Sequence, residues 1–460
     1  NANGLYGSKG QGSGGGIYVN VGVLSGSGRV QADGGGLRSS WGGGGGGRIG
    51  ISYDQRDGFD ASNGIRVAGG AGGADNQSAP GTLYLKKAGE MGQLVIDRKA
   101  GATGSAWLWL PEGTNYEEEV LLRGAGTTVE VWSASITPSN LYLMDGATLT
   151  HPAATATNES RLELNVPGML NISSNSAIDV SGKGYVAGRT WPNTTVGAST
   201  NYSGGSYGGL GGRYGTDTVN AVYGDFRNPN ELGSGAGTVK QGNQAGGGLV
   251  RIMAGTLVLD GGINASGLNG MYGRGSGGGI LLDVGILSGA GHVTAQGGSS
   301  ASYVPHGGGG GRIAIYYDQL DGFDVSNRIS AAGGRGSDHD GAPGTVFLKK
   351  AGEAGQLAID RKDGGAKAGW AWLPEGATNY LGEVVLRGAG TTVDVWSASI
   401  APTNLYLMDG AVLTHRAATT NEEYRLELDV AGTLSVGSNS AIDVSGKGYL
   451  PGWTCPGTTN

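Results

Sequence analysis

The stretch Gly255-Thr-Leu-Val-Leu-Asp-Gly-Gly-Ile-Asn-Ala-Ser-Gly267 carries the pattern that decides the fold. It consists of a short apolar strand, a polar corner rich in glycine, and a second short strand that ends in glycine. Residues 168–182 and 17–34 repeat this cassette with other side chains. Stacked cassettes of this kind can bury the apolar faces of their neighbours, which is the packing of a coiled solenoid.

The segments around the cassettes alternate apolar and polar residues with the period of two that is typical of half-buried strands. Asp-Gly and Pro-Gly pairs, such as Asp145-Gly146 and Pro167-Gly168, separate these segments as turns. No stretch of ten residues shows the spacing of an amphipathic helix. The sequence therefore predicts an all-β chain folded as a parallel β-helix or solenoid. Serial β-sandwich domains remain the alternative, because Asp-Gly pairs suit hairpins equally well.

The chain contains a long tandem repeat, in which Asn1-Ala-Asn-Gly-Leu5 returns as Asn264-Ala-Ser-Gly-Leu268. Residues 1–263 form repeat unit 1, and residues 264–460 form unit 2, which is truncated. Both ends of the chain fall within a unit, so we expect a window cut from a longer array. The two units join without a Pro/Ser linker or a charge run, and we therefore expect them to stack directly.

Each unit divides into three zones of different composition. In unit 1 the zone 1–81 is rich in glycine, 82–185 is dense in strands, and 186–263 is a Gly/Asn/Tyr loop followed by strands. We expect limited proteolysis to cut within 186–245 and to spare 255–267, where a strand crosses the boundary between the units.

Composition excludes several classes of protein. The 460 residues include 97 glycines, with 38% hydrophobic and 15% charged residues, so the chain is too apolar for a solvated disordered segment. Only 13 prolines and no strict Gly-x-y period exclude collagen. The net charge of −7 predicts no nucleic-acid partner, and no apolar run is long enough to predict membrane insertion.

Runs of consecutive glycine, such as 42–47 and 307–311, lead directly into apolar strands in both units. Ordering such runs costs much conformational entropy. They could be mobile loops, or they could pack backbone against backbone with no side chain between. Their matched position before a strand favours order.

The cassettes, together with blocks such as Gly45-Gly-Gly-Arg-Ile-Gly-Ile51, resemble those of giant repetitive secreted bacterial surface proteins of filamentous-haemagglutinin-like character. The resemblance covers the whole chain. It lies in composition and short repeated patterns and includes no catalytic or ligand-binding motif. It implies a glycine-rich β-helical shaft, an extracellular or cell-surface location, and a role in adhesion, sheath or biofilm matrix.

Few residues suggest chemistry. Three aspartates around a glycine turn recur in both units, and they could hold Ca²⁺, although Asp-Gly turns with Asx hydrogen bonds explain them better. They are Asp54, Asp57, Asp60, Asp318, Asp321 and Asp324. Of the five histidines only His151 and His415 correspond between units, which argues against a repeated triad or metal site.

Tryptophans alternate on one strand in each unit, so each pair projects from one face. The pairs are Trp107 with Trp109, and Trp370 with Trp372. Exposed, they could stack on sugar rings. A core or subunit-interface role is favoured, as it is for the Tyr/Gly stretch at 202–209.

The sequence therefore predicts a non-catalytic structural protein, an extracellular fibre or stalk that continues in tandem or self-associates and needs no cofactor. A carbohydrate-binding adhesin, with a cell-surface polysaccharide as partner, is the alternative. A polysaccharide-degrading β-helix enzyme is the weakest hypothesis, because the acidic run at 117–119 is not kept in unit 2.

Overall fold

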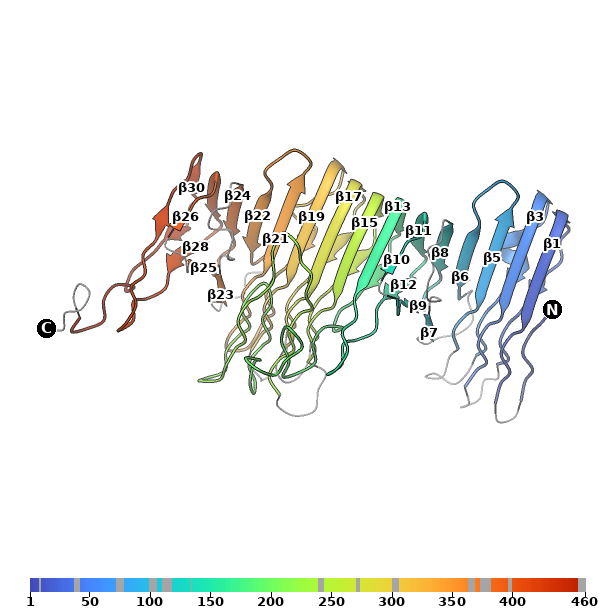
Figure 1. Cartoon of the computed structure of the whole chain (residues 1–460), viewed down its shortest axis with the longest axis horizontal. Helices are drawn as coiled ribbons and strands as arrows, with labels where there is room; N and C mark the ends of the chain where they lie inside the picture. Colours follow the sequence, from blue (N-terminus) through green and yellow to red (C-terminus); the bar gives the residue numbers. More distant parts are fainter. Residues whose placement is uncertain are drawn as a thin grey trace.

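The computed structural model forms a long stack of strands, with the two termini at opposite ends (Figure 1). It describes residues 1–7, 10–36, 42–71, 78–98, 106–109, 118–133, 135–238, 244–269, 274–299, 306–362, 369–372, 382–395 and 399–453. Nearly all of its elements are strands, as the sequence predicts, and the single helix α1 (Ala61–Gly64) is one turn long. Within these residues no helix is long and apolar enough to span a membrane.

One 16-stranded sheet, here called the main sheet, runs the length of the molecule with its strands side by side in chain order (Figure 1). Its strands are β1 (Gly16–Ser25), β3 (Arg48–Asp57), β5 (Thr82–Lys87), β6 (Gln93–Asp97), β8 (Glu119–Arg123), β11 (Asn140–Met144), β13 (Leu162–Ile172), β15 (Leu249–Leu259), β17 (Gly279–Ser288), β19 (Arg312–Asp321), β21 (Thr345–Lys350), β22 (Gln356–Asp360), β24 (Glu383–Arg387), β27 (Asn404–Met408) and β30 (Leu434–Val436), with β10 (Ser135–Ile136) paired beside β13.

Short strands that follow the main-sheet strands form separate second sheets. The longest second sheet contains β7 (Ala106–Trp109), β9 (Thr127–Glu130), β12 (Thr148–Thr150), β14 (Ala177–Asp179), β16 (Gly262–Asn264), β18 (His292–Thr294) and β20 (Ile329–Ser330). The others are β2 (Val30–Gln31) with β4 (Ile65–Arg66), β23 (Gly369–Trp372) with β25 (Thr391–Val395), β28 (Val412–His415) and β31 (Ala441–Ile442), and β26 (Ser399–Ile400) with β29 (Glu427–Leu428).

The Asp-Gly pairs make corners between sheets. Asp145 and Gly146 have φ angles of 55° and 86°, and they carry the chain from β11 in the main sheet to β12 in a second sheet. Asp409 and Gly410 repeat this corner with φ angles of 54° and 86°. Only glycine and a few short polar residues adopt such positive φ angles readily, which explains the pair at this position.

The Pro167-Gly168 pair was wrongly predicted to be a turn between two strands. The structure has a single strand, β13, whose pairing with β15 shifts register between Val166 and Met169. The two residues therefore form a bulge within a long strand, where proline can be accommodated because the ladder is locally interrupted.

The strands pair in parallel, with two exceptions among the described residues: β5 with β6, and β21 with β22. At each of these hairpins the buried core moves to the opposite face of the main sheet. On β6, Val95 packs with the core of β3 and β5, whereas Leu94 and Ile96 pack with the core that continues through β8 to β21. On β22, Ala358 packs against the core that extends from β8 to β21. Leu357 packs in the next core, on the opposite face of the sheet.

The glycine runs are packed rather than open. Gly308 donates its amide hydrogen to the oxygen of Gly298 at 3.1 Å, and Gly334 donates to the oxygen of Gly308 at 2.7 Å. A Cβ on Gly334 would lie 1.9 Å from the oxygen of Gly298. No side chain fits at that distance, so these positions need glycine for close approach of backbones. Gly298, Gly308, Gly334 and the glycine runs that pack in the same way lie beside the strands, and we call them the glycine layer.

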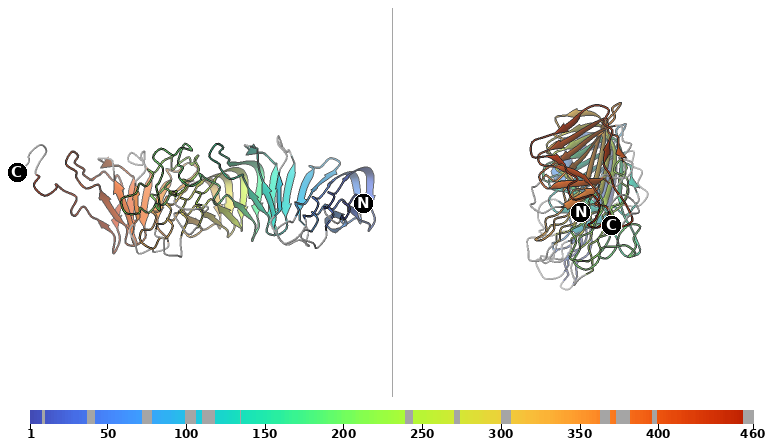
Figure 2. Two further views of the ribbon diagram at one scale, coloured as in Figure 1. Left: turned by 90° about the horizontal axis from the view of Figure 1, so that it is seen from below. Right: turned by 90° about the vertical axis from the view of Figure 1, so that its left-hand side faces the viewer.

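The sequence predicts an accessible loop at 186–245, but its described parts, 186–238 and 244–245, are largely packed. Residues 203–232 are here called the covering segment. Their first part hydrogen-bonds to the glycine layer, and their later part packs on the outer face of β17, β19 and β21, the face turned away from the apolar core of these strands. Tyr207 and Phe226 are completely buried there. Figure 2 shows this part of the chain in two further views. The burial of aromatic rings among glycines explains why a polar-looking segment is ordered.

Candidate functional site

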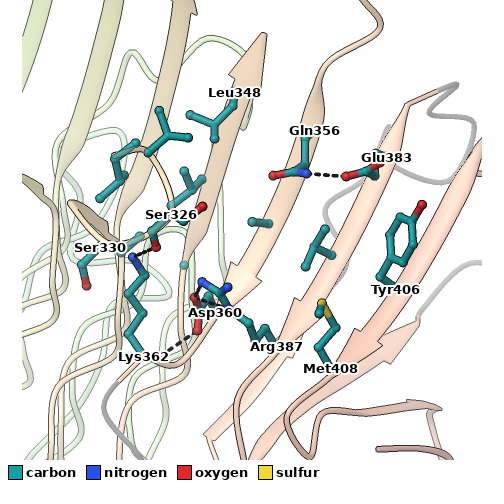
Figure 3. A pocket seen from close by; sticks show the side chains of 17 residues that line it. Ser326, Ser330, Leu348, Gln356, Asp360, Lys362, Glu383, Arg387, Tyr406 and Met408 are labelled. Atoms are coloured by element: carbon teal, nitrogen blue, oxygen red, sulfur yellow. Dashed lines mark hydrogen bonds and ion pairs between the residues drawn. The ribbon is translucent and has the colours of Figure 1, made fainter. Parts of the chain in front are cut away.

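A groove opens on the main sheet at the second hairpin, where the core changes faces (Figure 3). Its volume is about 360 Å³. One wall comes from β21 and from the segment around Ser326 and Ser330, and the floor comes from β22, β24 and β27. We call it the hairpin groove.

The groove exists because the strands after the hairpin bury their other face. Leu357, Leu386 and Leu407 point into the apolar core on the opposite face of β22, β24 and β27 and are fully buried. Side chains at alternate positions of the same strands must then face the groove. They are Gln356, Ala358, Asp360, Glu383, Val385, Arg387, Tyr406 and Met408.

Polar side chains in the groove form hydrogen bonds between neighbouring strands. Arg387 donates from Nε to Asp360 Oδ2 at 2.9 Å, and Gln356 donates from its side-chain amide to Glu383 (Figure 3). The ammonium group of Lys362 donates a hydrogen bond to the backbone oxygen of Ser326 across the groove. The Arg387 side chain is 33% exposed and Asp360 only 9%, so one edge of this ion pair remains open to a ligand.

Unit 1 repeats this arrangement at the first hairpin, around a smaller cavity of about 120 Å³. Arg123 donates from Nε to Asp97 at 3.0 Å, and Gln93 donates to Glu119 at 3.2 Å. Tyr142 occupies the position of Tyr406, and burial, followed by the charge of Glu119, raises the pKa of its phenol. The polar row is thus a property of the repeat.

The chemistry of this row suits recognition of a polyhydroxylated ligand. Amide, carboxylate and guanidinium groups lie beside a tyrosine ring, and sugars are bound by planar polar groups together with aromatic faces. The carboxylates already accept hydrogen bonds from arginine or glutamine. These hydrogen bonds fix the orientation of the carboxylates within the row.

The aspartates predicted to form turns or calcium sites are divided between two structures. Asp60 accepts hydrogen bonds from the amides of Ser62 and Asn63, and Asp324 repeats these bonds in unit 2. These are the capping bonds of an Asx turn. Asp54, Asp57, Asp318 and Asp321 lie on β3 and β19 instead. No group of three His, Cys, Asp or Glu residues that could hold a metal occurs in the described parts of the chain.

The tryptophan pairs lie on strands, as predicted. Trp107 and Trp109 are on β7, which pairs in parallel with β9, and Trp370 and Trp372 are on β23, which pairs in parallel with β25. Their side chains lie outside the described residues, so the sugar-stacking alternative stays a prediction.

Sequence reasoning missed Trp132, which is 48% exposed and donates from Nε1 to Glu130 at 3.0 Å. It lines a separate cavity of about 350 Å³ together with Glu159 and Arg161. In the sequence it lies two residues after Glu130, the last residue of β9. A tryptophan beside a carboxylate and an arginine is a second place where a polar ligand could stack.

His151 holds two parts of the chain together. It is completely buried; its Nδ1 lies 2.7 Å from the oxygen of Pro152, and its Nε2 accepts from the amide of Leu249 at 3.3 Å. Burial lowers its pKa to about 4. The neutral ring therefore joins the turn after β12 to the start of β15.

Comparison with known proteins identifies no relative. No family model, no curated protein and no solved structure matches the chain. Its function must therefore be inferred from its own geometry.

Proposed function

We propose that this chain is a length of β-solenoid shaft, a non-catalytic structural element of an extracellular fibre. The observation that supports it best is the main sheet, whose strands follow one another in chain order through both units without a break. A protein built in this way covers distance, and each turn of the chain is stabilised mainly by its two neighbours.

Parallel pairing supports a solenoid over serial β-sandwiches. Sandwich domains are built mostly from antiparallel hairpins and meanders. Here antiparallel pairs occur only at the two hairpins of the described chain. Between them the chain alternates regularly between the main sheet and a second sheet.

The boundary between the units is also continuous. Asn264, the first residue of unit 2, is the last residue of β16, which pairs with β14 of unit 1 and with β18 of unit 2. One apolar core includes Ile178 of unit 1 and Val293 of unit 2. Units joined in this way would form a stiff shaft rather than beads on a string.

Electron microscopy of the native material tests the proposal. From β1 to its counterpart β17 the main sheet advances eight strands, and at about 4.8 Å per strand the axial rise is roughly 38 Å per unit. We expect thin fibres with this spacing or a multiple of it. Compact particles from the full-length protein would refute the shaft.

Carbohydrate binding is the second candidate function, and the recurrence of the hairpin groove in both units favours it. A glycan array probed with the whole chain should then give hits that are lost when Tyr142 and Tyr406 are both changed to alanine. Tyr214→Ala, at an exposed site outside the grooves, is the control. Absence of binding at millimolar sugar would remove this candidate.

A further inference from the structure

One buried histidine has no hydrogen-bond partner. His306 comes directly before the glycine run 307–311 and is only 2% exposed. Neither of its ring nitrogens forms a hydrogen bond within the described part of the chain. Each nitrogen of an imidazole is a donor or an acceptor, and a buried polar atom that stays unpaired costs free energy. Such an unpaired ring therefore points to a bound ion or a water that would complete it.

A second histidine lies next to it on the following turn of the chain. His306 and His339 form a parallel bridge, and the amide of Gly307 donates to the backbone oxygen of His339 at 3.0 Å. The centroids of the two imidazole rings are 5.4 Å apart, with 27° between the ring planes. His339 is exposed, whereas His306 is buried. The pair therefore joins an enclosed imidazole to one that solvent ions can reach.

The spacing of the two rings suits one shared metal ion. A Zn–N bond is about 2.1 Å long, so two imidazoles on one tetrahedral ion have their ring centroids about 5 Å apart. The backbone already holds the two rings at nearly this distance. Rotation of the side chains is then enough to bring one nitrogen of each ring to the ion. Neutral imidazole binds Zn²⁺ and Cu²⁺, whereas Ca²⁺ and Mg²⁺ prefer oxygen ligands.

Carboxylates near the pair can offset the charge of a cation. Asp217, in the covering segment, donates from its backbone amide to the oxygen of Tyr214 at 2.8 Å, and the ring centroid of Tyr214 is 5.3 Å from that of His306. The Oδ1 atom of Asp217 accepts from Asn201 at 2.8 Å, but its Oδ2 atom is buried without a partner among the described residues. A buried, unpaired carboxylate oxygen is costly, and a nearby cation lowers that cost.

We propose that His306 and His339 bind one divalent metal ion of the zinc class. No third His, Cys, Asp or Glu in the described ranges completes a metal cluster with them, so water would supply the remaining ligands. The ion would tie two successive turns of the chain together beside the covering segment. The only histidine of unit 1 is His151, so this site would occur once in the chain, unlike the repeated grooves.

The experiment titrates the whole untagged chain with zinc chloride at neutral pH. It follows heat together with the ring-nitrogen NMR signals of protein labelled at histidine. We expect the signals of His306 and His339 to shift together and to saturate at one ion per chain. His339→Gln should weaken the affinity at least about tenfold, because it removes one of two imidazole ligands.

His292→Gln is the matched control, because His292 is the other exposed histidine in the described chain. It should leave the affinity within about twofold, since a lone surface imidazole binds zinc weakly. Both substitutions are at exposed positions, so both variants should unfold like the parent chain when zinc is absent.

Four results would overturn the proposal. They are no binding at millimolar zinc, a shift of His339 without one of His306, equal affinity in His339→Gln, and an equal response to magnesium. The last would assign binding to the carboxylates, since magnesium prefers oxygen ligands. Zinc binding can be measured whether or not the native material is fibrous, so this inference and the shaft can fail separately.

Discussion

The main sheet and the glycine layer bury backbone in two different ways. In the sheet, Leu282 and Ile315 exclude water with side chains, and both are fully buried. In the glycine layer, Gly308 and Gly334 have no side chains, so neighbouring backbones approach closely and leave no room for water. Their backbone groups hydrogen-bond to those neighbouring segments. The first region loses stability when a side chain shrinks, and the second loses it when one grows. One chain therefore combines two opposite tolerances to mutation.

Leu282→Ala should have the largest effect, because it leaves a cavity in the core shared by both units. We expect a loss of about 4 kcal/mol in the free energy of unfolding, measured by urea denaturation. Ile286→Ala, at an exposed position of the same strand, should cost much less. Equal losses would mean that the sheet is not held by this core.

Gly309→Ala tests the other region. The added methyl group would collide with backbone, and overpacking of this kind costs about 3 kcal/mol. Gly45→Ala makes the same chemical change in open space and should cost almost nothing. Urea denaturation of both variants measures the difference. A tolerated Gly309→Ala would show that the layer is loosely packed.

Acid should weaken the link that His151 makes between the turn after β12 and the start of β15. Burial lowers the pKa of His151 to about 4 in the folded chain, from an ordinary value near 6.5. As pH falls through this window the unfolded chain takes up the proton first, so stability present above pH 6.5 is lost towards pH 4. The loss at pH 5 should be about 2 kcal/mol.

The pH dependence of thermal unfolding measures this loss. His151→Gln should flatten the profile between pH 7 and pH 5, whereas His292→Gln, at an exposed site, should not. An unchanged profile in His151→Gln would assign the acid sensitivity to other groups.

The smallest effect is expected at the turns that lead back towards the glycine layer. Asp324→Ala removes a cap and should cost about 1 kcal/mol, while Asp318→Ala, at an exposed site on β19, should cost less. Adding calcium or a chelator should leave the melting temperatures of both variants and of the parent chain unchanged. A calcium-dependent rise that Asp324→Ala abolishes would restore the metal-site hypothesis.

Local features of the fold could be predicted from the sequence because they depend on neighbouring residues. The apolar run in Gln93-Leu-Val-Ile-Asp97 coincides with β6, and the Asp145-Gly146 pair marks a real change of direction. The reversal at 88–92 could not be predicted, because its Ala-Gly-Glu turn resembles the corners elsewhere. Whether a turn leads to a parallel or an antiparallel neighbour depends on contacts distant in the chain.

The hairpin groove escaped prediction for the same reason. Gln356, Glu383 and Arg387 look like ordinary outward residues of alternating strands. They form one row only because the core changes faces at the hairpin, which brings β21, β22 and β24 into one surface. The sequence points to the paired tryptophans as the aromatic candidates, whereas the structure places Tyr406 in the groove and exposes Trp132 elsewhere.

Strand length has a mechanical consequence for any fibre made from this repeat. The main-sheet strands β13, β15, β17 and β19 have 10 or 11 residues, whereas β6, β8, β11, β22, β24 and β27 have five. A rod bends most easily where its cross-section is narrowest. Such a fibre would therefore be narrowest once in every unit, at the five-residue strands. Its curvature would concentrate at these regularly spaced positions.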